Sequence, residues 1–302
     1  MVHSPIAVLI TCHNRRSQTC ACLEALKAQD IDFDLYLVDD GSSDGTAEAV
    51  ADCCPTAHII RGSGSLFWGG GMHLAFGRAL EKGYDYYLWL NDDTILRREA
   101  IATLLAHHAQ LIEGDREKSI VVGATKDPET SEPTYGGAIR SKKWYSNKYE
   151  FVSPGETLKE CETMYGNCVL IPSAVAERVG NIDNSFIHSM GDLDYGLRAR
   201  LAGCSIWLAP NYLGECAQND VTGSWVDTNL TPIRRLQQVS NIKNFPVKPW
   251  TTFVRRHSGP FWFAYWFLPY IRAIVGYQDL DDSPTFTQRR HKTSPTHEHR
   301  QD

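Results

Sequence analysis

The sequence lacks several features that would assign it to a specialised class of protein. No run reaches the roughly 18 uncharged residues that a membrane-spanning helix requires. A basic excess is also missing, since 30 Lys and Arg stand against 36 Asp and Glu, so the chain is not a general nucleic-acid-binding protein. The apolar content of 42% and the charged content of 22% are those of an ordinary globular protein. The 302 residues suffice for one large α/β domain or two small ones.

The nine cysteines lack the spacing of a zinc finger or of a disulfide framework. Cys20 and Cys22 are separated by one residue and Cys53 and Cys54 are adjacent, so neither pair fits the C-x2-C pattern. An odd total matches no secreted disulfide scaffold. The first apolar run, Ile6–Cys12, has no basic region before it and no cleavage site after it. We therefore expect reduced thiols in a cytoplasmic protein, with a strand in place of a signal peptide.

Apolar runs alternate with helical patterns over the first third of the chain. The expected buried strands are Ala7–Thr11, Leu35–Val38, His58–Ile60 and Tyr86–Leu90. The expected helices are Ser17–Gln29 with Ser17 as its cap, a helix ending near Cys53 and capped by Ser43 or Asp44, and one from the glycine-rich loop 62–71 to Lys82. This alternation predicts βαβ units, a parallel sheet, and ligands at the carboxyl ends of its strands.

The composition changes farther along the chain. Residues 127–160 are rich in Pro, Gly, Ser and Lys, which predicts loops or an irregular hairpin. A second ordered region is expected over 164–210. From residue 224 the chain is basic and aromatic, and the polar tail 281–302 predicts disorder.

Two adjacent carboxylates, Asp92 and Asp93, follow the fourth expected strand. Neighbouring carboxylates repel one another, so folding alone gives little reason to place them there. One or two carboxylates together with a diphosphate hold a hard divalent cation, which neutralises a departing diphosphate. The alternative is a helix cap, with Asp93 or Thr94 beginning a helix that reaches Leu105.

Two further acidic positions allow both a functional and a structural interpretation. Asp39 and Asp40 end the second strand, where they can bind a base and ribose or begin an ordinary polar turn. Asp192 precedes an amphipathic helix over Leu193–Leu201, as a general base for an acceptor hydroxyl or as a helix cap. The dehydrogenase fingerprint G-x-G-x-x-G is absent, because no glycine follows the first strand.

Together these motifs resemble the family 2 glycosyltransferases. The resemblance lies in four segments, Val8–Asn14, Val38–Thr46, Leu90–Thr94 and Gly191–Arg198, which occur in the family's order across about 6–210. It implies a GT-A fold, which is an α/β fold with a mostly parallel central sheet flanked by helices. It also implies a nucleotide-sugar donor, a divalent metal (Mn²⁺ or Mg²⁺) and inversion at the anomeric carbon. The bacterial polysaccharide and lipopolysaccharide enzymes, including rhamnosyltransferases, are the branch it is most similar to.

The resemblance assigns roles to individual residues. The residues expected at the nucleotide are Thr11, His13, Asp39, Asp40 and Asp92. Asp93 matches the metal-binding acid and Asp192 the catalytic base. The residues expected at the donor sugar or the acceptor are Trp68, Gly70, Asn167 and Gly191. His13 can equally fill a polar turn, and Trp68 can equally be a packed core residue.

Three positions depart from the family pattern. Gly191 stands where the family has Glu, so one acceptor-side carboxylate is absent. Residues 211–220 contain no histidine, although this region often carries a metal ligand in the family. Residues 64–73 hold three consecutive glycines in place of an Arg-Asn pattern, and these glycines allow close approach of a ligand to the backbone.

These assignments divide the chain into three parts. We expect a GT-A domain over 1–223, with a nucleotide-sugar half (1–115) and an acceptor half (116–223), followed by an extension (224–280) and the tail. Residues 255–271 combine basic residues with a dense aromatic run, which suits either a helix packed over the sheet or contact with a lipid interface.

The sequence thus predicts a metal-dependent inverting glycosyltransferase of surface polysaccharide synthesis. Its partners would be a nucleotide sugar and a saccharide or polyprenyl-linked acceptor, not nucleic acid, at the inner face of the cytoplasmic membrane. The alternatives are a sugar nucleotidyltransferase and a degenerate glycosyltransferase homologue that only binds carbohydrate.

Overall fold

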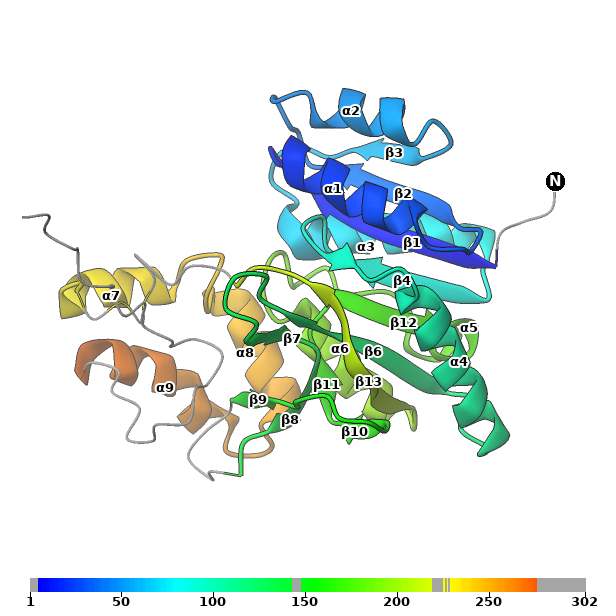
Figure 1. The fold of residues 1–302 in the computed structure, drawn as a ribbon. Coiled ribbons are helices and arrows are strands. Elements are labelled where there is room, and N and C mark those ends of the chain that lie inside the picture. Colours follow the sequence, from blue (N-terminus) through cyan, green and yellow to red (C-terminus); the bar gives the residue numbers. More distant parts are fainter. Residues whose placement is uncertain (1–4, 143–147, 219–224, 226, 228, 276–302) are drawn as a thin grey trace, which may run out of the picture.

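The fold is built around one large mixed sheet (Figure 1). The computed structural model describes residues 5–142, 148–218, 225, 227 and 229–275. Ten strands form this sheet in the order β10-β13-β6-β12-β4-β1-β2-β3, with β5 paired to β13 and β7 to β6. Their bounds are β1 Ile6–Cys12, β2 Asp34–Asp39, β3 His58–Arg61, β4 Tyr86–Leu90, β5 Ile95–Leu96, β6 Ser119–Lys126, β7 Pro133–Tyr135, β10 Lys159–Cys161, β12 Cys168–Pro172 and β13 Ser205–Glu215. A small second sheet joins β11 Thr163–Met164, β8 Gly137–Arg140 and β9 Tyr149–Phe151.

The four predicted strands form the parallel part of the large sheet. β1 pairs in parallel with β2 and β4, and β2 pairs in parallel with β3. Every residue of β1 is buried, as its uninterrupted apolar sequence predicted. β12 lies antiparallel between β4 and β6, so the sheet changes direction beside β4. The carboxyl ends of β1, β2 and β4 therefore meet at one edge, next to the amino end of β12.

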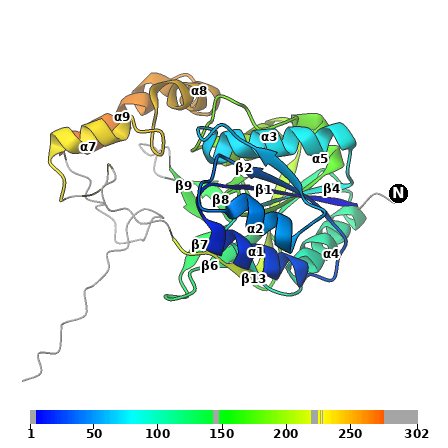
Figure 2. The ribbon, with the colours of Figure 1, turned by 90° about the horizontal axis from the view of Figure 1, so that it is seen from above.

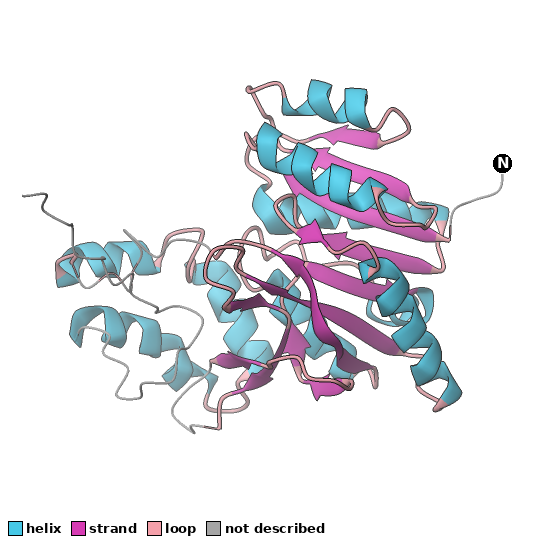
Figure 3. Ribbon diagram, viewed as in Figure 1, coloured by secondary structure: helices cyan, strands magenta, loops and turns pink. Residues whose placement is uncertain are grey.

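Helices cover both faces of this sheet (Figures 1 and 2). One face carries α1 Arg16–Lys27, α2 Thr46–Cys53 and α4 Ala100–Glu113, and the other carries α3 Phe67–Lys82, α5 Ser173–Val179 and α6 Gly191–Leu201. Each set of helices encloses its own buried apolar cluster against the strands. Figure 3, which colours helices and strands differently, shows the three layers of helices, sheet and helices.

Several local expectations were wrong. α1 begins at Arg16, and Ser17 makes no capping bond. The helix after Asp93 begins only at Ala100, with β5 in between, so neither Asp93 nor Thr94 caps it. Residues 127–160 were expected to form loops or an irregular hairpin; they contain short strands, of which β8 and β9 pair antiparallel with each other, β7 with β6 and β10 with β13. All nine cysteines are free thiols, as predicted.

The C-terminal extension forms three helices, α7 Pro232–Val239, α8 Val247–His257 and α9 Trp262–Val275. α8 packs against the second half of the main domain, where Trp250, Phe253 and Val254 are buried with Phe186 and Leu197. α7 and α9 project beyond it to one side of the molecule (Figures 1 and 2). Among the described residues, none of the helices has the length and apolar character needed to span a bilayer. The tail 281–302, predicted to be disordered, lies outside the described residues.

Candidate active site

The predicted site residues gather where β1, β2 and β4 end. Thr11 lies in β1, Asp39 ends β2 with Asp40 beside it, and Asp92 and Asp93 follow β4. This is the edge at which α/β sheets bind ligands, beside the change of strand direction at β12. The amino ends of α3 and α6 bring Trp68 and Asp192 to the same region by contacts described below.

The two aspartates after β2 have different partners. Asp39 accepts a hydrogen bond from the Ser42 amide at 3.0 Å. The two carboxylate oxygens of Asp40 accept from the amides of Gly64, at 2.7 Å, and Phe67, at 2.9 Å. Asp40 thereby fixes the glycine-rich loop and the start of α3 to the end of β2.

His13 lies in the loop that follows β1. Its Nδ1 donates to the main-chain carbonyl of Asp40 at 2.6 Å. Its neighbour Asn14 has φ +51°, donates its amide to Ser42 and accepts from the amide of Ser43. The loop after β1 and the loop after β2 are thus held together as one surface.

A guanidinium joins the two carboxylates that follow β4. Arg15 contacts Asp92 Oδ1 through Nη1 at 2.9 Å and Asp93 Oδ2 through Nη2 at 2.9 Å. Asp92 is only 5% exposed, and its other oxygen accepts from the Thr19 hydroxyl at 3.5 Å. The Asp93 side chain is 19% exposed, so it is the more accessible carboxylate of the pair.

Burial dominates the ionisation of Asp92. Desolvation raises its pKa to about 6 even though Arg15 opposes that rise, and the neighbouring charge of Asp93 adds to it. Burial also raises the pKa of the Cys216 thiol far above its usual range. Cys216 donates to Asp93 Oδ1 at 3.4 Å and accepts from the Asn167 amide at 3.5 Å. Asn167, which was expected on the acceptor side, is therefore connected to Asp93 through this thiol.

Trp68 connects the end of β4 to the neighbourhood of Asp192. Its indole nitrogen donates to Asn91 Oδ1 at 2.8 Å, and its ring packs edge-on against Trp89, with centroids 6.2 Å apart. The ring also covers Gly166, where an added Cβ would collide with it. Packing accounts for the buried part of this half-buried side chain, and contact with a sugar stays a prediction.

The three consecutive glycines at the start of α3 serve close packing. A Cβ on Gly71 would collide with the Thr11 side chain, and one on Gly69 with the carbonyl of Phe186. The amide of Gly70 donates to the carbonyl of Ile187 at 3.1 Å. Thr11 and Gly70, both predicted ligand contacts, are therefore also points at which protein elements meet.

Asp192 lies in the first turn of α6. Its carboxylate accepts from the amides of Gly166, at 3.1 Å, and Leu193, at 2.8 Å. Burial raises its pKa despite these two amides. A carboxylate with a raised pKa is a stronger proton acceptor, as a general base requires.

Gly191, beside Asp192, is tightly enclosed. A Cβ there would lie 3.3 Å from the Phe186 Cβ and 3.4 Å from Ile182 Cγ2. A glutamate in its place would require these neighbours to shift, which gives a packing reason for the departure from the family's Glu-Asp pair.

Asp194, two residues from Asp192, is fully buried among cationic groups. It accepts from Arg198 Nε at 2.8 Å, Arg256 Nη1 at 2.6 Å and His257 Nε2 at 2.8 Å. Burial alone would raise its pKa, but the hydrogen bonds from His257 and Arg198 hold it below its usual value. Asp194 thus binds α8 to α6 and is a poor candidate for the base.

The protein offers a hard cation only the carboxylate oxygens of Asp92 and Asp93. No cluster of three or more His, Cys, Asp and Glu side chains that could hold a metal occurs in the described part of the chain. Mg²⁺ and Mn²⁺ accept one or two carboxylates when substrate phosphates and water supply the remaining ligands. The more exposed Asp93 and the buried Asp92 can supply these one or two carboxylate ligands.

The fold is that of a GT-A glycosyltransferase. The model of the family described as glycosyl transferase family 2 matches residues 7–180, and the chain belongs to this family. The matched segment contains the acids after β2 and β4 and ends before α6, so it leaves out Asp192. None of the curated proteins compared with the chain matches it significantly.

Three solved structures are similar to this fold. Mannosyltransferase PcManGT from Pyrobaculum calidifontis, in complex with GDP-Man and Mn²⁺, shares 16% identity at a TM-score of 0.56, over 91% of this chain and 73% of that one. S. aureus TarS 1-349 shares 14% identity at a TM-score of 0.51, over 89% and 80%. GalNAc-T7 with UDP, GalNAc and Mn²⁺ shares 15% identity at a TM-score of 0.62, over 89% of this chain and 53% of that one, so this chain spans about half of its length.

Three contributors to the site were not predicted. Arg15 and Cys216 contact the carboxylates from 77 and 123 residues away, and Asn91 accepts from Trp68. No sequence spacing links such distant residues. Asn91 was part of the predicted Asn91-Asp92-Asp93 motif, but its hydrogen bond with Trp68 was not predicted.

Proposed function

We propose that this glycosyltransferase moves a sugar, with inversion, from a nucleoside diphosphate sugar to a hydroxyl of a saccharide or lipid-linked acceptor in surface polysaccharide synthesis. The observation that supports this most is the chain of contacts from Asn91 through Trp68 to Gly166 and Asp192. It joins the carboxylates after β4 to Asp192, the aspartate of α6 that contacts no cation within the described residues. A leaving-group site and a proton acceptor then face one substrate.

In the proposed reaction these residues act as follows. The acceptor oxygen attacks the anomeric carbon while Asp192 takes its proton, and the bond to the diphosphate breaks with its electron pair leaving on the phosphate oxygen. Attack opposite the leaving group inverts the anomeric centre. Holding both substrates in line supplies much of the rate enhancement. Asp39, Thr11 and His13 would contact the nucleotide, and Trp68, Gly70, Asn167 and Gly191 would lie on the side of the sugars.

A divalent cation completes this proposal. Asp93 would hold Mn²⁺ or Mg²⁺, with Asp92 adding charge behind it, and the cation would neutralise the leaving diphosphate. Two of the similar structures contain Mn²⁺ together with a nucleotide or nucleotide sugar, which supports this choice by analogy of fold.

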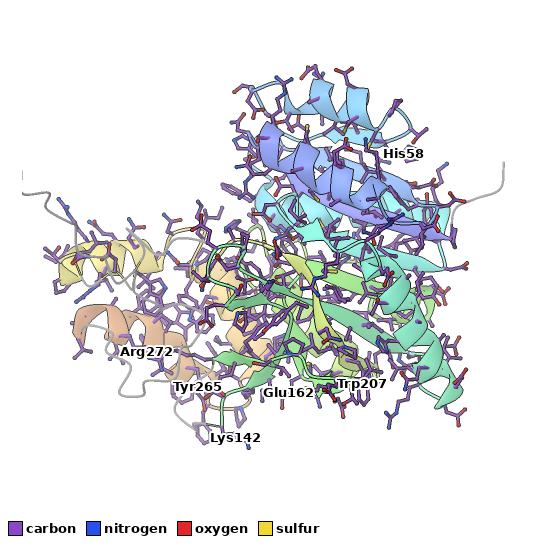
Figure 4. The ribbon with its side chains drawn as sticks, in the orientation of Figure 1. His58, Lys142, Glu162, Trp207, Tyr265 and Arg272 are labelled. Carbon is purple, nitrogen blue, oxygen red and sulfur yellow. The ribbon has the colours of Figure 1, made fainter. Side chains whose placement is uncertain are left out.

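We also propose a peripheral contact with the inner face of the cytoplasmic membrane through residues 255–271 and the rest of α9. Four apolar side chains at helical spacing are 53–58% exposed, namely Phe263, Phe267, Ile271 and Ile274. Residues 229–275 carry several Lys and Arg and no Asp or Glu, which suits anionic headgroups. Tyr265 and Arg272 of α9 lie at the opposite end of the molecule from His58 of β3 (Figure 4). Such a contact would serve a polyprenyl-linked acceptor.

The deciding experiment is a thermal-shift screen of UDP, GDP and dTDP with and without Mn²⁺, followed by assay of the matching sugar donors. Ligand binding to the native state raises apparent stability, so one nucleotide should raise the Tm and Mn²⁺ should increase that shift. Released nucleoside diphosphate together with a glycosylated acceptor supports the proposal. Release of pyrophosphate from a nucleoside triphosphate and a sugar 1-phosphate, assayed in parallel, would instead identify a nucleotidyltransferase, and binding without turnover a degenerate homologue.

A further inference from the structure

Arg15 is the cation that neutralises the carboxylate pair in the structure as described. Its guanidinium bridges Asp92 and Asp93, at 2.9 Å from each. The other groups that contact these carboxylates, the Thr19 hydroxyl and the Cys216 thiol, are uncharged, and burial holds the pKa of that thiol high. Within the described residues, the pair thus depends on one guanidinium for its positive partner.

The charge balance sets a condition on metal binding. Two carboxylates and one guanidinium leave one net negative charge, so a divalent cation added alone would give the cluster a net positive charge beside the guanidinium. The guanidinium of Arg15 and the metal would repel each other. Solvent screens this repulsion only in part, because Asp92 beside them is buried. A nucleoside diphosphate brings the negative charge that makes both cations acceptable.

Arg15 is also placed to respond to that charge. Arg15 immediately precedes α1, and its side chain is 39% exposed. It belongs to the loop after β1, which is hydrogen-bonded to the loop after β2 through Asn14 and Ser42. A guanidinium that is partly exposed can turn from a carboxylate to a phosphate, for which its planar fork is equally suited.

We propose that Arg15 is a resident counter-ion that keeps Asp92 and Asp93 closed to a divalent metal until a nucleoside diphosphate binds. Metal and nucleotide then bind as a coupled pair, and by linkage each increases the affinity of the other by the same factor. Arg15 acts here as a positioning residue of the metal site. This inference rests on the proposed function, because it takes the nucleotide and the metal from it.

The test measures free Mn²⁺ by electron paramagnetic resonance in titrations with and without the nucleotide that gives the largest thermal shift. Arg15→Gln should bind Mn²⁺ alone at least tenfold more tightly than the wild type, because the competing charge is gone. In the wild type the nucleotide should strengthen Mn²⁺ binding by a larger factor than in Arg15→Gln. Arg16→Gln is the matched control, since this exposed neighbour contacts neither carboxylate, and it should behave like the wild type.

Arg15→Lys keeps a positive charge and should give a Mn²⁺ affinity between those of the wild type and Arg15→Gln, which a merely structural role would not produce. Unfolding curves establish that each variant is folded, and Arg15→Lys provides the comparison if Arg15→Gln is not. Arg15→Gln that binds Mn²⁺ no more tightly than Arg16→Gln overturns the inference. A wild type that binds the nucleotide but takes up no Mn²⁺ with it contradicts the metal in the proposed function, which is a separate failure.

Discussion

Asp93 is the residue on which the metal assignment depends. Its carboxylate is the more accessible of the pair, and no helix begins at it, so capping no longer explains it. We predict that Asp93→Ala abolishes the Mn²⁺-dependent part of nucleotide binding. The fold should persist, because removing one of two adjacent carboxylates also removes their repulsion and leaves Arg15 to Asp92.

Calorimetric titration of the nucleotide with and without Mn²⁺ measures this effect. Asp52→Ala, at an exposed position in α2, serves as the control and should bind like the wild type. If Asp93→Ala retains Mn²⁺-enhanced binding, the metal is held elsewhere.

Asp192 carries the proposed proton transfer. We predict that Asp192→Asn lowers kcat by about 10²-fold or more, the usual scale for a general base, while nucleotide affinity stays nearly unchanged. Because burial raises the pKa of Asp192, activity in the wild type should fall on acidification at a pH above that at which an ordinary aspartate titrates. The pH profile of kcat/KM measures this limb, and Asp192→Asn should lose the part of it that Asp192 contributes and keep the part that Asp92, with its pKa of about 6, contributes. An unchanged kcat in the variant would require another base.

The site could be predicted only in part at the scale of residues. The positions of the aspartates after β2 and β4 were predicted, because the strands of a βαβ pattern all end at the same edge of the sheet. Arg15, Cys216 and the Trp68–Asn91 bond could not be found, because they depend on how distant segments pack. The three glycines were predicted to approach a ligand, whereas two of them admit Thr11 and the carbonyl of Phe186.

At the scale of elements, α6 and α8 are joined by one buried carboxylate. Asp194 of α6 is 0% exposed and accepts from Arg256 and His257 at the end of α8 and from Arg198 of its own helix. We predict that Asp194→Asn lowers the free energy of unfolding by about 3 kcal/mol, because removing one partner leaves buried charge uncompensated. Glu81→Gln, which breaks an exposed pair with Arg78, should cost less than about 1 kcal/mol.

The pH dependence distinguishes this ion cluster from simple packing. The pKa of Asp194 is lowered in the native state, so its contribution to stability is present above the unfolded pKa of about 4 and is lost as the pH falls through the native pKa. The difference between the wild type and Asp194→Asn in urea unfolding should therefore shrink as the pH falls below about 4. A difference that does not depend on pH would show that the cost comes from packing.

The elements themselves were predictable where the apolar pattern was continuous or periodic. The first four strands agree with prediction to within one residue at each end, because a buried parallel sheet requires uninterrupted apolar runs. α3 ends at Lys82 as predicted but begins at Phe67, within the stretch 62–71 that was expected to be a loop. The short strands between residues 133 and 161 were predicted only as loops or an irregular hairpin, because β7 and β10 are held by pairing with β6 and β13 rather than by their own composition. α9 continues through Pro269, although a proline inside a helix removes one main-chain hydrogen bond.

At the scale of the whole molecule, the extension has two environments. α8 is packed beside the small sheet and α6 rather than over the large sheet. The segment 255–271, for which a helix packed over the sheet was one interpretation, lies mostly in α9. α9 packs on α7 and α8 through one side only, with Ala273 and Pro269 buried. The remaining side of α9 is apolar and exposed, and that side is where lipid contact is proposed.

We predict that replacing two residues of this exposed stripe, in Phe267→Ser/Ile271→Ser, abolishes co-sedimentation with vesicles containing anionic phospholipid. Both side chains are more than half exposed, so their loss should leave folding and nucleotide binding intact. Ile112→Ser/Leu201→Ser is the matched control, since these residues are also exposed but lie on α4 and α6. Binding should weaken with added salt, because cations of the extension meet the headgroups within a Debye length. If the wild type does not co-sediment with anionic vesicles at low salt, the proposed lipid contact of α9 is wrong. An acceptor without a lipid would then be the better proposal.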